Sequence, residues 1–182
     1  MVNPMDRRFM MEAAQGGMAE VQLAQLAQQK GSSDAVKQYA KMLEQDHTKA
    51  NDELKQVAQQ KSVDLPTDVG PKHHAMMQKF QGLSGEQFDR AYVKMMVLDH
   101  KKDIKDFQRQ ADRGMDSDVK GFASKTLPTL QGHLKEVEQL ASNKGSGSGS
   151  MGTRSRSDSG SSSSGQDSSA QPKSQNNPTP QP

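Results

Sequence analysis

The sequence predicts an all-α fold, an antiparallel four-helix bundle made of two helical hairpins with a long crossover between them. In four long segments, apolar residues recur at alternating spacings of about four and three, as on one face of an amphipathic helix. Within each pair of segments, the break is short and contains a glycine. Between the pairs, two prolines and a glycine at 63–71 predict an irregular crossover. The four segments are 6–30, 33–61, 84–113 and 116–142.

The first hairpin has recognisable signals at both ends of its turn. Asp6 is predicted to cap the first helix at its N-terminus. Gly31 is predicted to end that helix in the left-handed conformation, which glycine adopts without strain. Ser32 or Ser33 is expected to cap the second helix. The apolar face of the second helix is continuous apart from one histidine, and it consists of Val36, Ala40, Leu43, His47, Ala50, Leu54 and Val57.

The second hairpin follows a short helical turn expected around 73–80. Ser84 and Gln87 have the spacing of a capping box at the start of the third long helix. Asp116 or Ser117 is expected to cap the fourth. Both hairpins therefore have short turns, and the only long connection joins one hairpin to the other.

An internal repeat supports this layout. When the chain is shifted by 83 positions, Gly31 aligns with Gly114, Val36 with Val119 and Glu20 with Asp103. The repeat indicates that two similar helical hairpins are joined in one chain. Short turns within hairpins and a long connection between them are typical of ferritin-like bundles.

Three histidines fall on the predicted apolar faces. His47, His100 and His133 each interrupt the face of a different helix near its middle, and Glu20 occupies the matching position in the first helix. Four helices would thus each direct one metal-binding side chain into a common interior. The distance of each candidate from its hairpin turn follows from a rise of about 1.5 Å per residue. By this measure Glu20 and His47 differ by roughly 7 Å along the helix axis, and so do His100 and His133.

The residue types favour a single transition-metal ion over an oxygen-rich pair. Glu44 and His47 reproduce one Glu-x-x-His motif of di-iron bundles, but His100 and Asp103 have the reverse order. With Glu20, His100 and His133, the set offers three imidazoles and one carboxylate, and Glu44 and Asp103 are auxiliary candidates. Such ligands suit Zn, Fe, Cu or Ni, and we expect the cofactor to be Zn, Fe or Cu.

A second hypothesis needs no metal. Histidines inside a bundle are commonly satisfied by neighbouring acids, and Asp46, Asp99 and Asp103 are near enough in sequence to serve. The protein would then be a non-enzymatic structural or interaction protein. No nucleophile elbow or catalytic triad is recognisable, so enzymatic activity is not the favoured hypothesis.

Composition excludes several classes of protein. The 182 residues have a net charge of +2 and include two Tyr, five Phe and no Trp, and no basic face is evident, so nucleic-acid binding is not expected. No apolar run approaches the roughly 20 residues of a membrane span. Without cysteine there is neither a disulfide nor a thiolate metal site. A protein partner is not identifiable, and a homodimer is compatible with the sequence.

The C-terminal region differs in composition from the rest. Residues 145–182 are dominated by Ser, Gly, Gln, Asn and Pro, and such a segment buries too little apolar surface to fold. We therefore expect a folded domain at 1–144 and a disordered tail at 145–182. The run GSGSGS at 145–150 is either a natural tether or an artificial linker.

Four stretches of the chain, at 12–30, 36–58, 88–107 and 122–137, include the segments GGMAE, DHTKAN and LPTL. In these stretches the chain closely resembles the DUF4142 family of bacterial proteins. The resemblance covers about 8–141. It implies a ferritin-like four-helix domain, usually exported, often labelled an outer-membrane protein and linked to stress responses, but it implies no activity. The first ten residues lack the apolar core of a signal peptide, so a periplasmic or exported location and a cytoplasmic one both stay open.

Deletion of residues 145–182 is expected to leave the stability of the domain unchanged, because no packed surface would be lost. The free energy of unfolding should change by less than about 0.5 kcal/mol. Thermal melts of the full and shortened chains test this, and a clearly lower midpoint for the shortened chain would contradict it.

Overall fold

The computed structural model describes residues 1–145, and this part of the chain is all-α, as the sequence predicts. It contains five helices and no strand. The predicted tail beyond residue 145 lies outside the described residues. The helices are α1 (Pro4–Lys30), α2 (Asp34–Gln60), α3 (Gly70–Gln81), α4 (Gly85–Arg113) and α5 (Ser117–Gly145).

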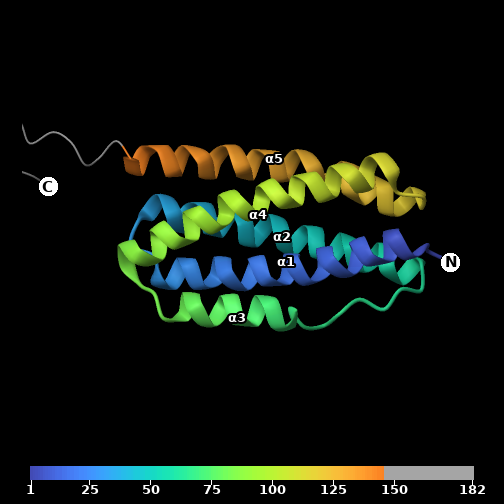
Figure 1. Cartoon of the computed structure of the whole chain (residues 1–182), viewed down its shortest axis with the longest axis horizontal. Helices are drawn as coiled ribbons and strands as arrows, with labels where there is room; N and C mark the ends of the chain where they lie inside the picture. Colours follow the sequence, from blue (N-terminus) through green and yellow to red (C-terminus); the bar gives the residue numbers. More distant parts are fainter. Residues whose placement is uncertain (146–182) are drawn as a thin grey trace, which may run out of the picture. The chain divides into compact units, whose positions relative to one another are not determined.

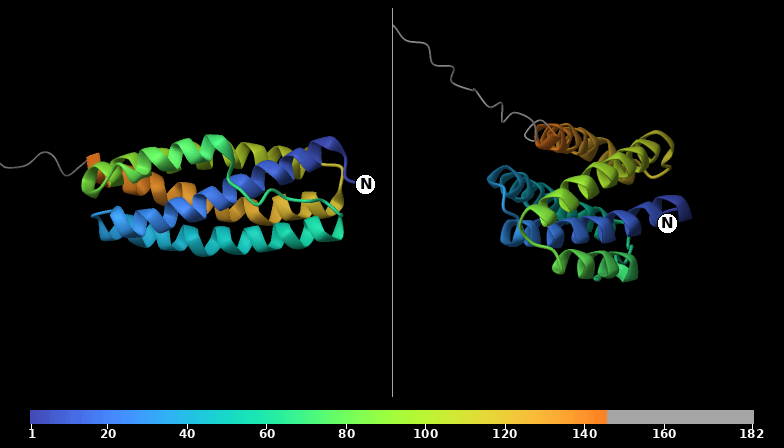
Figure 2. Two further views of the ribbon diagram at one scale, coloured as in Figure 1. Left: turned by 90° about the horizontal axis from the view of Figure 1, so that it is seen from below. Right: turned by 60° about the vertical axis from the view of Figure 1, so that its left-hand side comes forward.

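The four long helices pack side by side as two antiparallel hairpins. α1 pairs with α2 and α4 pairs with α5, while α1 also contacts α4 and α2 contacts α5 (Figure 1). The chain leaves α2 at one end of the bundle and returns along its length through an extended segment and α3 before α4 begins (Figures 1 and 2). α3 lies against α1, outside the bundle. The predicted long crossover is confirmed, and it is more helical than the short turn expected at 73–80.

The apolar core has two parts. One is centred on Tyr39, Phe88 and Tyr92, and the other contains Phe9 and Phe122. Along each long helix, residues of one part are followed by residues of the other, with a buried polar side chain between them. Those polar side chains are Glu20 in α1, His47 in α2, His100 in α4 and His133 in α5.

Each hairpin caps the other through a buried aspartate. Asp89 of α4 accepts hydrogen bonds from Ser32 N (3.2 Å), Ser32 Oγ (2.8 Å) and Ser33 N (2.9 Å) at the start of α2. Asp6 of α1 accepts from Met115 N (3.0 Å) and Asp116 N (2.7 Å) at the start of α5. Asp6 and Asp89 are 83 positions apart, so the sequence repeat is also a structural one.

This arrangement corrects the predicted role of Asp6. The N-cap of α1 is Asn3, whose Oδ1 accepts from Met5 N (2.9 Å) and Asp6 N (3.1 Å). Proline fits the first turn of a helix, where no backbone donor is needed, so α1 starts at Pro4. Asp6 is therefore inside the first turn and free to cap α5.

The predicted left-handed conformation of Gly31 is wrong. Gly31 is extended, with φ −67° and ψ 154°. Glycine is needed there for a different reason: a Cβ atom would lie 2.7 Å from Ala27 O and 2.9 Å from Asp89 Oδ1. Glycine is thus required at position 31 by the close approach of Asp89, and not by a left-handed backbone conformation. The predicted capping box at Ser84 is also wrong in part, because Ser84 is the N-cap of α4 but makes no side-chain cap hydrogen bond.

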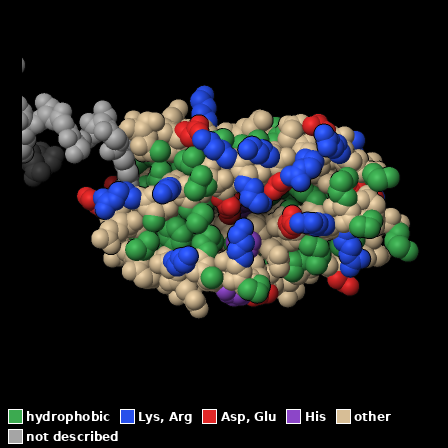
Figure 3. Space-filling view, in the orientation of Figure 1, with side chains coloured by type: hydrophobic (Ala, Val, Ile, Leu, Met, Phe, Trp, Pro, Cys, Tyr) green, Lys and Arg blue, Asp and Glu red, His purple; other side chains and the backbone are tan. Residues whose placement is uncertain are grey.

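The side chains on the face in Figure 3 carry mixed charge. Lys and Arg are interspersed with Asp and Glu across this face. Charged side chains also pair between helices, as in Lys101 Nζ with Glu138 Oε1 (2.8 Å) and Lys125 Nζ with Glu53 Oε1 (3.0 Å). Exposed pairs of this kind contribute little to stability.

Replacing Asp6 by Ala is expected to lower the free energy of unfolding by about 2–4 kcal/mol. The substitution leaves Gln110 Nε2 and the backbone N–H groups of Met115 and Asp116, just before α5, without their acceptor. Urea denaturation measures the effect. Asp112→Ala, at an exposed position of α4, is the control, and it should change stability by no more than about 0.5 kcal/mol. Equal stabilities of the two variants would contradict the capping role.

Candidate metal site

The bundle brings Glu20, His47, His100 and His133 together in its interior. Their exposed fractions are 3%, 7%, 0% and 3%. One ring nitrogen from each histidine lies within 4.8 Å of the others, and the ring centroids are 5.4–5.9 Å apart. Despite the stagger estimated from the sequence, these four predicted residues share one site.

Hydrogen bonds fix the protons on two of the rings. His100 Nδ1 lies 3.0 Å from Met96 O, a carbonyl that only accepts, so this nitrogen carries the proton. His133 Nε2 lies 2.8 Å from Asp46 Oδ2 and donates to that carboxylate. The remaining nitrogens, His100 Nε2 and His133 Nδ1, each hold a lone pair, and they face each other at 3.3 Å. Neither neutral ring has a proton to share with the other.

Glu20 places a negative charge beside these rings. Its Oε2 lies 2.8 Å from His47 Nε2 and 3.8 Å from His100 Nε2. The contact with His47 is close but does not have hydrogen-bond geometry, so His47 Nε2 and both Glu20 oxygens are buried without a well-formed hydrogen bond. Polar atoms of this kind are costly inside a protein unless a ligand or ion compensates them.

The electrostatics of the site separate the four groups. Burial opposes the charged form of Glu20, but the nearby histidines outweigh it and lower the Glu20 pKa to about 2. Burial also lowers the His133 pKa to about 4, although Asp46 opposes this, and burial lowers the His100 pKa. For His47, the charge of Glu20 outweighs burial, so its pKa is raised. His100 and His133 are thus neutral near pH 7, the form that binds metal ions.

A second group of acids adjoins the histidines. Glu20, Asp99 and Asp103 each place a carboxylate oxygen within 4.8 Å of the other two. Burial and the charge of Glu20 raise the pKa of Asp99 to about 6 and that of Asp103 to about 8. Asp103 was predicted as an auxiliary ligand, and the structure brings it to Glu20 rather than to all three histidines.

Glu44 lies apart from both groups. Its oxygens accept hydrogen bonds from Gln25 Nε2 (2.8 Å) and Gln28 Nε2 (2.7 Å) of α1. The Glu-x-x-His spacing that singled it out puts Glu44 and His47 almost one turn apart, but Glu44 pairs with glutamines between α1 and α2. The structure therefore does not bring Glu44 into the histidine cluster.

Sequence reasoning did not identify Asp99 as a member of the acidic group. Asp99 is next to His100, off the apolar face, and was considered only as a hydrogen-bond partner. The available signal was its spacing of four residues from Asp103, which places both acids on one side of α4.

The family model described as "Domain of unknown function (DUF4142)" matches residues 1–140. The chain belongs to the DUF4142 family. No curated protein matches the sequence.

Two solved structures show the same fold as this DUF4142 domain. A DUF305 fragment from Deinococcus radiodurans has a TM-score of 0.68 at 15% identity, over 78% of this chain and 98% of that one. A DUF305 protein from Streptomyces coelicolor, described as secreted, has a TM-score of 0.65 at 14% identity, over 78% of this chain and 94% of that one. At these identities the likeness concerns the fold alone.

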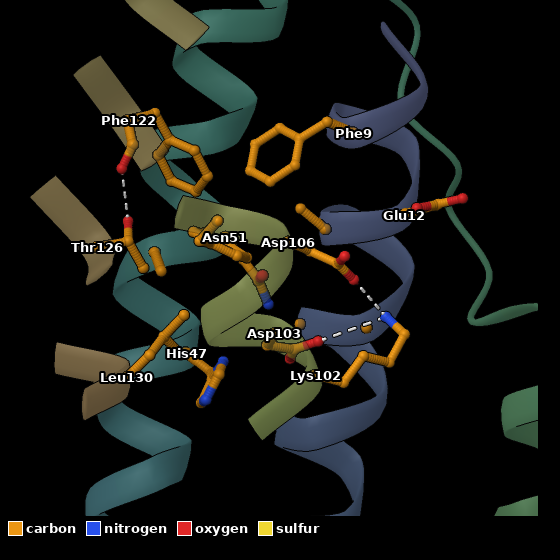
Figure 4. A pocket seen from close by; sticks show the side chains of 15 residues that line it. Phe9, Glu12, His47, Asn51, Lys102, Asp103, Asp106, Phe122, Thr126 and Leu130 are labelled. Atoms are coloured by element: carbon orange, nitrogen blue, oxygen red, sulfur yellow. Dashed lines mark hydrogen bonds and ion pairs between the residues drawn. The ribbon is translucent and has the colours of Figure 1, made fainter. Parts of the chain in front are cut away.

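Several hollows reach the site of the DUF4142 domain, and one of about 100 Å³ is lined by Asp46, His47 and His133. A cavity of about 50 Å³ is lined by His47 and Asp103, with Phe9, Asn51 and Leu130 among its other walls (Figure 4). A larger hollow of about 430 Å³ is lined by residues of α1, α3 and α4, including Asp99 and Asp103. None of the helices in the described region is long and apolar enough to cross a membrane.

Replacing His133 by Leu is expected to change how stability depends on pH in metal-free protein. The His133 pKa is about 4 in the folded state, below the ordinary value of 6.5. Between these values the unfolded chain binds a proton that the native ring does not, so His133 lowers stability as pH falls from 6.5 toward 4. His133→Leu should therefore gain stability relative to the parent protein over this window.

The comparison must be made between proteins because other groups act in the opposite sense. Asp99 has a pKa raised to about 6 and Asp103 a pKa raised to about 8. Below these values, each group binds a proton more readily in the native state than in the unfolded chain. Urea denaturation with chelator at several pH values gives the difference between variant and parent. A difference that is constant from pH 7 to pH 4 would contradict the neutral, buried state of His133.

Proposed function

We propose that this DUF4142 domain binds one transition-metal ion through His47, His100, His133 and Glu20. The observation that carries the proposal concerns two nitrogen atoms, His100 Nε2 and His133 Nδ1. Each holds a lone pair, and they lie 3.3 Å apart in a buried site. Two acceptors at this distance repel each other unless a cation lies between them. Because burial lowers the pKa of both rings, a proton does not fill this role near pH 7.

The separation also suits a metal ion. Two nitrogens bound tetrahedrally at about 2.0–2.1 Å from zinc are about 3.3 Å from each other. With His47 and Glu20 the site offers three imidazoles and one carboxylate, a set typical of Zn, Fe or Cu. The unsatisfied oxygens of Glu20 supply negative charge at the same place. The expected cofactor is therefore a single divalent ion of this group.

Neighbouring groups hold the rings for this task. Met96 O fixes His100, and Asp46 fixes His133, so each ring directs its free nitrogen to the site. Tyr39 Oη donates to His133 O (3.2 Å) and holds the backbone of α5. Partners of this kind orient metal-binding histidines in proteins.

The competing function is a non-enzymatic structural or interaction protein with a buried polar network. It is favoured by one observation: protein groups already satisfy one nitrogen of each of two rings, through the His133–Asp46 and His100–Met96 hydrogen bonds. Under either function, we propose a role in the bacterial envelope that includes responses to stress, and the DUF305 neighbour described as secreted supports the envelope location.

Replacing His47, His100 and His133 together by Leu is expected to abolish stoichiometric metal binding while the protein stays helical. Leu continues the apolar faces of α2, α4 and α5 without adding a void. Elemental analysis of protein purified without a metal-affinity tag should find about one Zn, Fe or Cu ion per parent chain and none per variant chain. Circular dichroism checks the fold.

The matched control replaces the other two histidines. His73 and His74 lie in α3, where they contact Val69 O and Asp68, and His73→Leu/His74→Leu should keep the full metal content. Excess Zn²⁺ at 100 times its Kd should stabilise parent and control by about 2.7 kcal/mol. Tight, stoichiometric binding retained by the triple variant would refute the site, and metal-independent melts of the parent would favour the structural network.

A further inference from the structure

A second cluster of ligands lies beside the histidines and shares Glu20 with them. Asp99 and Asp103 are one turn apart on α4 and face α1, where Glu20 lies. One oxygen from each of the three carboxylates is within 4.8 Å of the other two. Glu20 is also 2.8 Å from His47 Nε2, so this single side chain contacts both clusters.

The protein supplies little positive charge to these acids. Within the described chain, the basic side chain in ion-pair range of Asp103 is Lys102, at 3.7 Å from Oδ1. Lys102 is more closely paired with Asp106 Oδ2, at 2.8 Å, and is itself 57% exposed. Three carboxylates at this spacing repel one another, and the repulsion is strong because Glu20 is buried.

Glu20 provides an independent indication of a ligand. It is 97% buried by its exposed fraction of 3%, and neither of its oxygens has a well-formed hydrogen bond. One ion at the histidines would occupy one oxygen of the carboxylate. The other oxygen would still face Asp99 and Asp103, and carboxylates this close come together only around a shared proton or a shared cation.

There is also a route to the acids from the surface. The hollow of about 430 Å³ between α1, α3 and α4 is lined by Asp99, Asp103 and Asp106. The smaller cavity is also lined by Asp103 and reaches His47 (Figure 4). Asp103 therefore lies between open space and the histidine cluster.

We propose that Glu20, Asp99 and Asp103 bind a second divalent cation, and that Glu20 is shared between this ion and the one held by the histidines. The proposal rests on the proposed function, because Glu20 is a ligand in both. Carboxylate oxygens alone select harder ions than imidazoles do, so the second ion belongs to the class of Mn²⁺ and Mg²⁺. The cation takes the place of the protons that otherwise relieve the repulsion among the acids.

The test titrates Mn²⁺ into full-length protein already loaded with one equivalent of Zn²⁺, followed by the electron paramagnetic resonance of free Mn²⁺. The parent protein is expected to take up one further equivalent. The variant Asp99→Asn/Asp103→Asn should keep its zinc, but its affinity for Mn²⁺ should fall by at least about 100-fold. Loss of a residue outside the coordination shell costs at most about this much, and the loss of two ligands should cost no less. Equal Mn²⁺ affinity in parent and variant would overturn the proposal.

Two further variants separate this proposal from the single-ion function. Glu86→Gln/Asp112→Asn removes two exposed acids from α4 and should leave Mn²⁺ binding unchanged. An equal loss of Mn²⁺ binding in this control would mean that net charge, and not a site, holds the ion. Glu20→Gln should weaken both ions, and a loss of only one would refute the shared ligand.

The two proposals fail in different ways. If the parent binds one Zn²⁺ and no Mn²⁺, the acidic site is wrong and the histidine site stands. If the parent binds Mn²⁺ through Asp99 and Asp103 but no Zn²⁺, the histidine site and the shared role of Glu20 are wrong. Asp103→Asn alone serves as the test variant should the double variant not fold, which circular dichroism decides.

Discussion

The structure depends most on a carboxylate held in the middle of an apolar core. Glu20 is buried at the level where the two parts of the core meet, and an isolated charge at that depth would be prohibitive. The surrounding rings make it tolerable, and they keep its pKa near 2 in spite of burial. Glu20 in turn affects the protonation of the side chains around it. It raises the pKa of His47, and together with burial it raises the pKa of Asp103 to about 8, so that Asp103 is protonated near neutral pH, where a free aspartate would be charged.

The reciprocal caps explain how the helices are held in the register that this site needs. Asp89 binds the start of α2, and Asp6 binds the start of α5, so each hairpin fixes the axial position of the other. The histidines come from three helices, and a shift of one helix by a single turn, about 5.4 Å, would separate them. Gly31 contributes by leaving room for Asp89 to approach.

The sequence predicts most of this fold because helix periodicity is a local signal. The positions of His47, His100 and His133 on the apolar faces follow from spacing alone, and the crossover follows from the prolines and the glycine at 63–71. What the sequence could not supply are contacts between helices. Asp6 looked like a local cap because no local pattern shows that its acceptor oxygens reach α5, and Glu44 looked like a ligand because its competing partners, Gln25 and Gln28, lie on another helix. Asp99 was overlooked because a residue at the edge of an apolar face points inward or outward according to its neighbours.

The repeat gives a reason why the site has histidines on one side only. Shifted by 83 positions, Glu20 corresponds to Asp103, and His47, His100 and His133 correspond to Leu130, Gly17 and Ala50. All four counterparts line the cavity of about 50 Å³, so this cavity occupies the equivalent place in the other half of the bundle. The three imidazoles there are replaced by small or apolar residues, which accounts for the empty space. The acid is kept, and because Glu20 and Asp103 approach within 4.8 Å, the two halves of the repeat meet at a pair of carboxylates. A centre built this way is nitrogen-rich on one side of that pair and oxygen-rich on the other, which is the asymmetry that two ions of different hardness require.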